Sequence, residues 1–393
     1  MVEALGDTDS TSRSLLTLKA AAQNVDQVVG LTHRHYKYPA RFSPQFVSAA
    51  IEEFSSPGDL VLDPHVGGGT TLIEAMARGR VAVGGDVNTL ATFVTRVKST
   101  FLSEAELNDV EDWAVNAAQT ISYRNRSELD PDESRTYNLQ IPRARAIKKY
   151  LSLSLDSLTL LGTRGSQELA RCVLLSAGQW AFNGRKRAVG LSEFRAKVRL
   201  IAFDMIASTR AFSKVVRDLP AHVRKPTVIH DAAQNIATHF PFSEGIKADL
   251  VVTSPPYPGV HILYHRWQVD GRKETPAPYW IANCLDGHGS KYYNYGGRSN
   301  SGLEDYFETS LRSMIGIRAA MKDGGTIVQM LAFSEPESQL GRYLDNMKLA
   351  GFSEIGLSGS TRIWRDVPGR NWHANSKGKL TASKEVVLVH VAS

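Results

Sequence analysis

The chain has 393 residues, 42% of them hydrophobic, which is enough for a core larger than that of one minimal domain. Its formal net charge of +6 favours polyanionic partners. No apolar run reaches about 18 residues, and the polar first residues lack the basic-then-apolar layout of a signal peptide, so neither a membrane span nor a secretory leader is expected. We expect residues 1–25 to form a flexible arm.

A strand, a glycine turn, a helix and a second strand follow one another from residue 59 to residue 86. The run 59–63 is short and apolar, the turn reads Asp-Pro-His-Val-Gly-Gly-Gly, and the next apolar run ends at Asp86. This order predicts a β-turn-α-β unit of a parallel sheet. Glycines let a ligand approach the turn closely, and the following helix N-terminus offers N–H groups to an anion. Asp86 can accept hydrogen bonds from both hydroxyls of a ribose. A tight turn without a ligand is the alternative interpretation.

Residues 101–225 differ from the rest in being basic and rich in helix formers. The stretch 143–225 contains 17 Lys and Arg but 5 Asp and Glu, so the remainder of the chain is net acidic. Apolar residues recur at helical spacing over 170–182 and 194–216. We therefore expect a helical insert that binds DNA or recognises the target. Its tightest basic cluster is Arg185, Lys186 and Arg187.

Strand-like runs resume after the insert and continue to the end of the chain. They cover residues 227–231, 248–256, 324–333, 351–364 and 384–392. The order predicts an α/β fold with a mostly parallel sheet. Its catalytic domain would comprise residues 26–100 and 226–393, with the helical insert between the two parts.

The run Thr253-Ser254-Pro255-Pro256-Tyr257 directly follows an apolar strand. Two prolines cannot continue a central strand, so they fix a stiff bend at the carboxyl end of the sheet, where open α/β sheets bind ligands. The bend would hold the Ser254 hydroxyl and a backbone carbonyl as acceptors for an amino group. Tyr257 offers a flat face on which a base can stack. A rigid turn with a surface tyrosine is the alternative interpretation.

Residues 269–303 are rich in Gly, Pro, Tyr and Asn and show weak periodicity. We expect them to form a long loop near the active site, since loops of this length in compact domains are often functional. Arg266, just before this stretch, is a further candidate for binding nucleic acid.

The two cysteines, Cys172 and Cys284, are far apart and belong to no CxxC pair. Neither a disulfide framework nor a metal site is therefore expected. Two free thiols fit a reducing compartment, so we expect a cytoplasmic protein.

Together, the glycine turn and the Ser-Pro-Pro-Tyr run resemble motifs of the amino-methyltransferases of DNA. The serine form, with a threonine before it, is most similar to the N4-cytosine members. Residues 38–42 (YPARF) resemble an element that completes the cofactor pocket, Asp231 matches an acidic residue for the adenine amino group, and residues 321–325 (MKDGG) match a turn before a strand. The resemblance implies a Rossmann-like class I methyltransferase with a mostly parallel seven-stranded sheet. It also implies S-adenosylmethionine as the methyl donor.

The resemblance assigns two sets of site residues. The catalytic set is Ser254, Pro255, Pro256 and Tyr257. The cofactor-binding set is Tyr38, Arg41, Phe42, Asp63, His65, Gly67, Gly69, Thr70, Asp86, Asp231 and Thr253. This chain departs from the family at His65, where an apolar aromatic residue is commoner. It also departs in having the insert between Asp86 and Asp231.

An exocyclic amino nitrogen is a poor nucleophile, because its lone pair is delocalised into the base. The Ser254 hydroxyl and the Pro255 carbonyl would hold its two N–H groups and aim the lone pair at the methyl group, so that positioning drives a direct transfer. Within a duplex the base must first be flipped out.

We therefore expect methylation of cytosine N4 in a specific sequence of double-stranded DNA, and the resemblance suggests a companion restriction endonuclease. The alternatives are methylation of adenine N6 in DNA, an RNA base amino-methyltransferase of the guanine-N2 type, and a nucleic-acid-binding protein with an inactive methyltransferase core.

Overall fold

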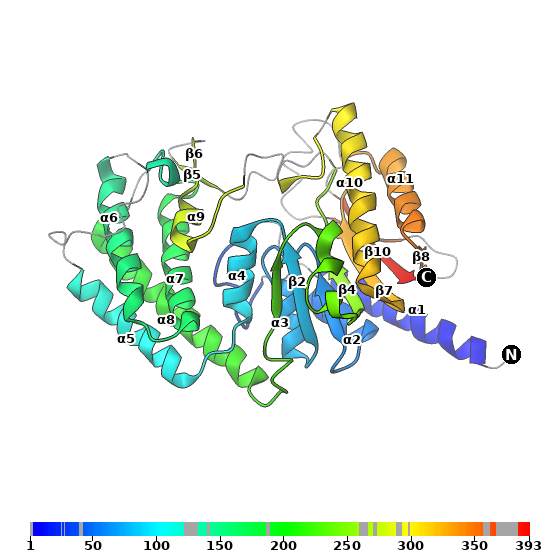
Figure 1. Cartoon of the computed structure of the whole chain (residues 1–393), viewed down its shortest axis with the longest axis horizontal. Coiled ribbons are helices and arrows are strands. Elements are labelled where there is room, and N and C mark those ends of the chain that lie inside the picture. Colours follow the sequence, from blue (N-terminus) through cyan, green and yellow to red (C-terminus); the bar gives the residue numbers. More distant parts are fainter. Residues whose placement is uncertain are drawn as a thin grey trace.

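The computed structural model describes residues 3–24, 26, 28–38, 42–121, 133–139, 142–185, 189–258, 266–269, 273–287, 293–297, 299–356, 362–366 and 384–393. A central sheet lies between a group of helices at one end of the molecule and a layer of two helices toward the other end (Figure 1). None of the described helices is long and apolar enough to cross a bilayer.

The central sheet has the strand order β3-β2-β1-β4-β7-β10-β8, with β9 paired to β10. Its strands are β1 (Leu60–Asp63), β2 (Val81–Asp86), β3 (Thr227–His230), β4 (Ala248–Thr253), β7 (Met321–Leu331), β8 (Phe352–Glu354), β9 (Ile363–Asp366) and β10 (Lys384–Ala392). Pairing is parallel from β3 to β7, and β10 runs antiparallel to its neighbours. The predicted Rossmann-like class is confirmed. The sheet has eight strands within the described residues because β9 adds to the seven expected.

Ten helices of at least eight residues and two shorter strands complete the main elements of the described chain. The longer helices are α1 (Glu3–Ala22), α2 (Pro44–Phe54), α3 (Thr70–Ala77), α4 (Thr89–Ser99), α5 (Glu104–Thr120), α6 (Pro142–Asp156), α7 (Arg164–Phe182), α8 (Leu191–Val216), α10 (Asn300–Ala319) and α11 (Pro336–Leu349). Between them lie β5 (Trp267–Val269), β6 (Lys273–Thr275), the short helix α9 (Ala277–Ala282), and the 3-10 turns η1 (Glu133–Arg135), η2 (Ser157–Leu160), η3 (Ala233–Thr238) and η4 (Phe242–Glu244).

Alternate residues of the central strands enter two different cores. In β1, Leu60 and Leu62 pack with α10 and α11 on one face, whereas Val61 packs with α2 and α3 on the other. This is the period of two that a pleated strand imposes, and both faces are apolar because helices cover both. The layers hold the carboxyl ends of β1, β2 and β4 along one edge.

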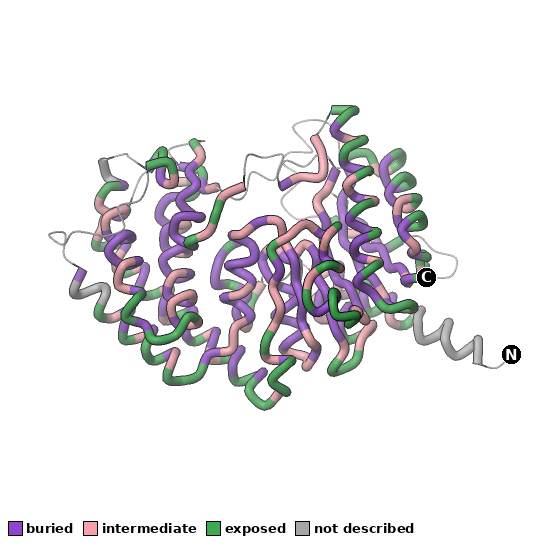
Figure 2. Tube along the Cα trace, viewed as in Figure 1, coloured by how far each residue is buried: buried purple, intermediate pink, exposed green. Residues whose placement is uncertain are grey.

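Residues 101–225 contain the helices α5 to α8, and the core that these helices form also includes residues from outside that range. This core includes residues from α5 to α8 and also Trp267, Tyr279 and Ile281. Buried segments run through the interior of this part as well as through the sheet (Figure 2). Conversely, Phe212 and Val216, at the end of α8, pack into a core of the sheet. The helical part is thus built from two separate stretches of the chain.

Two expectations about irregular segments were wrong. The N-terminal stretch is not a flexible arm, because it contains α1; Leu15, Leu18 and Ala22 lie on one face of that helix and are buried. The stretch 269–303 is not one long loop, because it contains β6, α9 and the start of α10. Tyr279 and Trp280, on α9, are buried in the core of the helical part.

Candidate cofactor and base site

The glycine turn joins the end of β1 to the start of α3. Gly67 and Gly69 have φ angles of +46° and +80°, which favour glycine. A Cβ on Gly69 would also lie 3.1 Å from the Thr95 backbone. Because Gly69 occupies the N-cap and has no side chain, α3 begins without a side-chain cap. The turn therefore leaves a helix N-terminus that suits an anionic ligand group.

Asp63 holds the glycine turn in place through hydrogen bonds to two neighbouring elements. Its Oδ2 accepts a hydrogen bond from the Thr71 hydroxyl at 2.7 Å, and its Oδ1 accepts one from Thr253 Oγ1 at 2.8 Å. Burial raises the pKa of Asp63 to about 6. The carboxylate thus ties the start of α3 to the end of β4. The prediction that Asp63 contacts the cofactor remains a prediction.

His65 extends this link to the stretch after α9. Thr253 has one hydroxyl proton and gives it to Asp63, so it must accept from His65 Nδ1, which lies 3.0 Å away. His65 Nε2 is then an acceptor for the hydroxyl of Tyr295. Burial lowers the pKa of His65 to about 3, so the ring is neutral. The residue that departs from the family pattern therefore has a polar role.

Asp86 ends β2 beside the glycine turn. Its Oδ2 accepts from the Gly67 N–H and its Oδ1 from the Asn88 N–H, both at 2.9 Å. Each oxygen retains a second lone pair that can accept from a hydroxyl. Burial raises the pKa of Asp86 to about 6. The carboxylate is thus oriented by two backbone amides, as a ribose site requires.

Tyr38 lies against the same turn. Its ring is buried, and a Cβ on Gly67 would lie 3.4 Å from it. The Asn88 side chain donates to the Tyr38 hydroxyl at 3.3 Å and accepts from Tyr279 at 3.2 Å. Tyr38 therefore shapes the turn and connects it with α9.

The remaining cofactor candidates occupy different positions. Phe42 packs on Phe46 in a core of the sheet, with ring centroids 5.7 Å apart, and Thr70 is buried at the start of α3. Asp231 accepts from the Asn235 side chain at 3.0 Å and pairs with His239 at 2.7 Å. Arg41 lies outside the described residues.

The Ser-Pro-Pro-Tyr run leaves the carboxyl end of β4. The Ser254 hydroxyl lies 3.0 Å from the Met330 carbonyl, to which it donates, and 3.3 Å from the Tyr257 hydroxyl. Tyr306 donates to the Pro256 carbonyl at 3.1 Å. Among the residues that the structure describes, none donates to the Pro255 carbonyl. The two acceptors predicted for an amino group are therefore held in a stiff bend.

The structure gives the candidate DNA-binding arginines protein partners. Arg266 pairs with Asp286 at 2.8 Å and donates to Tyr137 at 3.0 Å. Arg185 donates to the Trp180 carbonyl and lies over its ring, 4.5 Å from the centroid. Both thus have structural contacts, and their binding to DNA remains a prediction. Lys186 and Arg187 lie outside the described residues.

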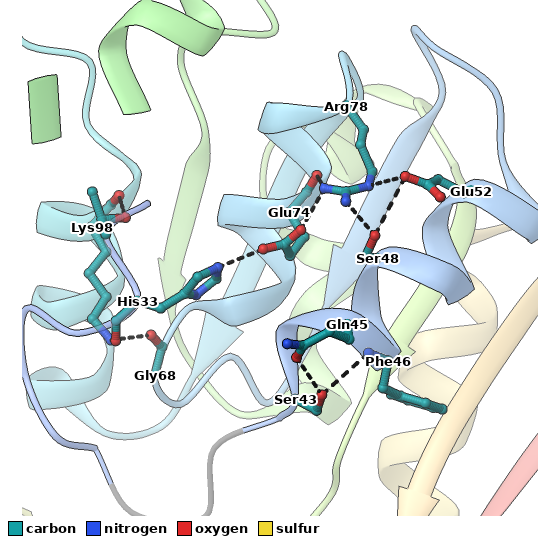
Figure 3. A network of polar contacts seen from close by, with 11 residues as sticks. His33, Ser43, Gln45, Phe46, Ser48, Glu52, Gly68, Glu74, Arg78 and Lys98 are labelled. Carbon is teal, nitrogen blue, oxygen red and sulfur yellow. Dashed lines mark hydrogen bonds and ion pairs between the residues drawn. The ribbon is translucent and has the colours of Figure 1, made fainter. Parts of the chain in front are cut away.

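A buried lysine beneath the glycine turn was missed in the sequence. Lys98 is 1% exposed, and its Nζ donates to the Gly68 carbonyl at 2.9 Å and the His33 carbonyl at 3.2 Å (Figure 3). His33 in turn contacts Glu74 on α3 at 2.6 Å. Lys98 follows Val94 by one helical turn on a buried face, and a lysine at such an apolar position was the available signal.

Comparisons with known proteins bear on the first part of the chain. Residues 16–91, which carry the glycine turn and Asp86, match the family model described as DNA methylase (N6_N4_Mtase). Over this stretch, the chain is similar to the DNA methylase family.

Two curated proteins also match the chain over short stretches, of 81 and 106 residues. The chain is 33% identical over 81 residues to Type II methyltransferase M.MvaI of Kocuria varians, which is 20% of this chain and 18% of that protein. It is 32% identical over 106 residues to Type II methyltransferase M.BsoBI of Geobacillus stearothermophilus, which is 27% of this chain and 19% of that protein. The matches thus span less than a fifth of either relative.

Similarity to solved structures is weaker. TrmN from Thermus thermophilus matches with a TM-score of 0.35 and 12% identity, over 92% of this chain and 52% of that one. The rRNA methyltransferase aviRa from Streptomyces viridochromogenes matches with a TM-score of 0.33 and 10% identity, over 93% of this chain and 91% of that one. The fold assignment therefore rests on the strand order described above.

Proposed function

We propose that the chain is a DNA methyltransferase that transfers a methyl group from S-adenosylmethionine to the N4 amino group of cytosine. The observation that carries the proposal is the hydrogen bond from Thr253 to Asp63, at 2.8 Å. It joins the Ser-Pro-Pro-Tyr run directly to the base of the glycine turn. The proposed acceptors of the amino N–H groups thus lie beside a turn that suits a nucleoside with a charged amino-acid part.

The residues around the turn fit S-adenosylmethionine. The oriented carboxylate of Asp86 suits the two ribose hydroxyls, and the uncapped start of α3 suits the carboxylate of the methionine part. When bound, this cofactor supplies a methyl group on a positively charged sulfur. The match of residues 16–91 to the DNA methylase family model supports the same methyl donor.

Ser254 and Pro255 are arranged as acceptors. Because the Ser254 proton is directed to the Met330 carbonyl, the lone pairs of its oxygen are available to an amino N–H. The Pro255 carbonyl would accept the second N–H. Holding both N–H groups on one side would localise the nitrogen lone pair on the other, toward the methyl group.

The cysteines do not suit a mechanism that forms a covalent bond to the base. Burial raises the pKa of Cys172 to about 12 and that of Cys284 to about 11, so both are neutral thiols near pH 7. A direct transfer to an amino group needs no thiolate. This chemistry supports nitrogen rather than ring carbon as the methyl acceptor.

DNA is the proposed polyanionic substrate, with its target base flipped out of the duplex. The 17 Lys and Arg of residues 143–225 would contact phosphates and so supply affinity without sequence information. The relatives are named Type II methyltransferases, which supports a companion restriction endonuclease as a further partner. We propose the cytoplasm as the location.

Nucleoside mass spectrometry tests the proposal. DNA and RNA from cells expressing the chain would be digested and compared with those from cells expressing a Ser254→Ala variant. N4-methylcytosine in DNA, present only with the unmodified chain, is expected. N6-methyladenine alone would keep the transfer chemistry and overturn the base, and N2-methylguanine in RNA would overturn the DNA substrate. Absence of any methylated base would favour a binding protein with an inactive core.

A further inference from the structure

A buried carboxylate that no motif identifies lies directly behind Tyr257. Glu385, on β10, is 5% exposed, and its Oε1 accepts from the Tyr257 hydroxyl at 3.0 Å. Arg365 lies opposite on β9 and donates to Oε2 at 2.7 Å. The arginine balances the carboxylate charge in a position with little access to water.

The contacts of Tyr257 form a continuous path of oxygen atoms. The Ser254 hydroxyl lies 3.3 Å from the Tyr257 hydroxyl, which lies 3.0 Å from Glu385 Oε1. Each hydroxyl can accept one proton while it donates another. The path therefore connects the proposed amino acceptor, at the end of β4, with the buried carboxylate.

Methylation of an amino group produces a proton that must leave. When the nitrogen–methyl bond forms, the carbon–sulfur bond breaks and its electron pair stays on sulfur, so the positive charge passes to the nitrogen. One N–H bond must then break. The prolines and the tyrosine ring of the Ser-Pro-Pro-Tyr run provide no acceptor for this proton, whereas the path ends at a carboxylate.

We infer that Glu385 accepts this proton through Tyr257 and Ser254, an inference that rests on the proposed function. The Ser254 hydroxyl, which donates to the Met330 carbonyl, first turns its proton toward Tyr257. The amino proton then passes to Ser254 Oγ as the serine proton passes to Tyr257, and the tyrosine proton passes to Glu385. The carboxylate becomes a neutral carboxylic acid, and the product amino group is neutral. Glu385 thus acts through Tyr257 and touches no substrate atom itself.

Single-turnover methyl transfer to DNA containing the recognised sequence, identified by sequencing methylated DNA from expressing cells, tests the inference. Glu385→Gln keeps the size of the side chain and an oxygen for the Tyr257 hydroxyl but cannot accept the proton. We expect the transfer rate to fall about 100-fold or more, as loss of a general base does. The dissociation constants of S-adenosylmethionine and DNA should stay within about twofold.

Tyr257→Phe provides a second break in the same path, because it keeps the aromatic face and removes the hydroxyl. From the stacking role alone, this variant would keep most of its activity. The path predicts instead a loss like that of Glu385→Gln, and no further loss in the double variant, since both changes block one route. If Glu385 and Tyr257 only stabilised the fold, the transfer rate per folded molecule would not change in either variant.

A matched control lies on the neighbouring strand. Glu354, on β8, holds Arg362 through two hydrogen bonds of 2.7 and 2.9 Å without contacting the Ser-Pro-Pro-Tyr run, so Glu354→Gln should transfer at the normal rate. The inference fails if folded Glu385→Gln is as fast as the unmodified protein, or if its loss multiplies with that of Tyr257→Phe. If the unmodified protein transfers no methyl group to DNA, the proposed function itself fails.

Discussion

Replacing Asp86 with asparagine should weaken cofactor binding through the loss of the negative charge and of one acceptor oxygen. The carboxylate holds two backbone N–H groups at 2.9 Å, and the proposed ribose hydroxyls would use its remaining lone pairs. Asparagine keeps the shape but offers one oxygen in place of two. A hydrogen bond to a charged group contributes about 1.5–3 kcal/mol, so the dissociation constant for S-adenosylmethionine should rise about 10- to 150-fold. Isothermal titration calorimetry measures this constant directly.

Asp249 gives a matched control at the amino-terminal end of the parallel strands, away from the glycine turn. It lies near the start of β4, accepts from the Leu60 N–H at 2.8 Å and pairs with Lys322. Asp249→Asn therefore removes a similar carboxylate far along the strand from the glycine turn and should leave cofactor affinity unchanged. If Asp86→Asn is folded and binds S-adenosylmethionine as tightly as the unmodified protein, Asp86 does not hold the ribose.

Three further outcomes are expected. Burial raises the pKa of Asp86 to about 6, and the ionised form accepts the ribose hydroxyls, so calorimetry should show cofactor affinity falling as pH drops below 6, by about tenfold at pH 5. The Asp86→Asn variant should lose this pH dependence, apart from any part that comes from Asp63, whose pKa is also raised to about 6. Replacement of Cys172 and Cys284 by serine should leave methylation per folded molecule intact, and a folded but inactive protein would contradict direct transfer. His65→Phe should lower the free energy of unfolding by about 1–3 kcal/mol in urea titrations, since two buried hydroxyls lose a partner, and an unchanged value would show that the links it makes are dispensable.

The parts of the site that could be predicted are those encoded by neighbouring residues. The glycine turn, Asp86 and the Ser-Pro-Pro-Tyr run each follow a strand closely, so local pattern was sufficient to expect them along one sheet edge. Glu385 is 128 residues from Tyr257, and Tyr295 is 230 residues from His65. Such pairs depend on the register of the folded chain, which no local pattern contains.

The errors in the fold have similarly physical causes. In α1, Leu15 and Leu18 are buried whereas Leu16 between them is exposed, and the mostly polar composition of the helix concealed this narrow buried stripe. In α9, six residues are too few to show helical periodicity, and the proline near its start suggested a loop. Tertiary packing against α7 decides its structure, through Trp280 and its neighbours.

The shared core of the helical part has a consequence for how that part can move. The chain leaves the sheet for it after α4, returns at β3, leaves again after β4 and returns before α10. Trp267 from the second passage stacks on Phe182 from the first, with ring centroids 6.2 Å apart. Four chain connections join the helical part to the sheet, so it cannot rotate about a single hinge. Deleting either of the two segments would expose the apolar surface of the other to water. The basic helices are therefore held at a fixed distance from the edge that carries the proposed site, and the proposed DNA substrate would have to conform to that spacing.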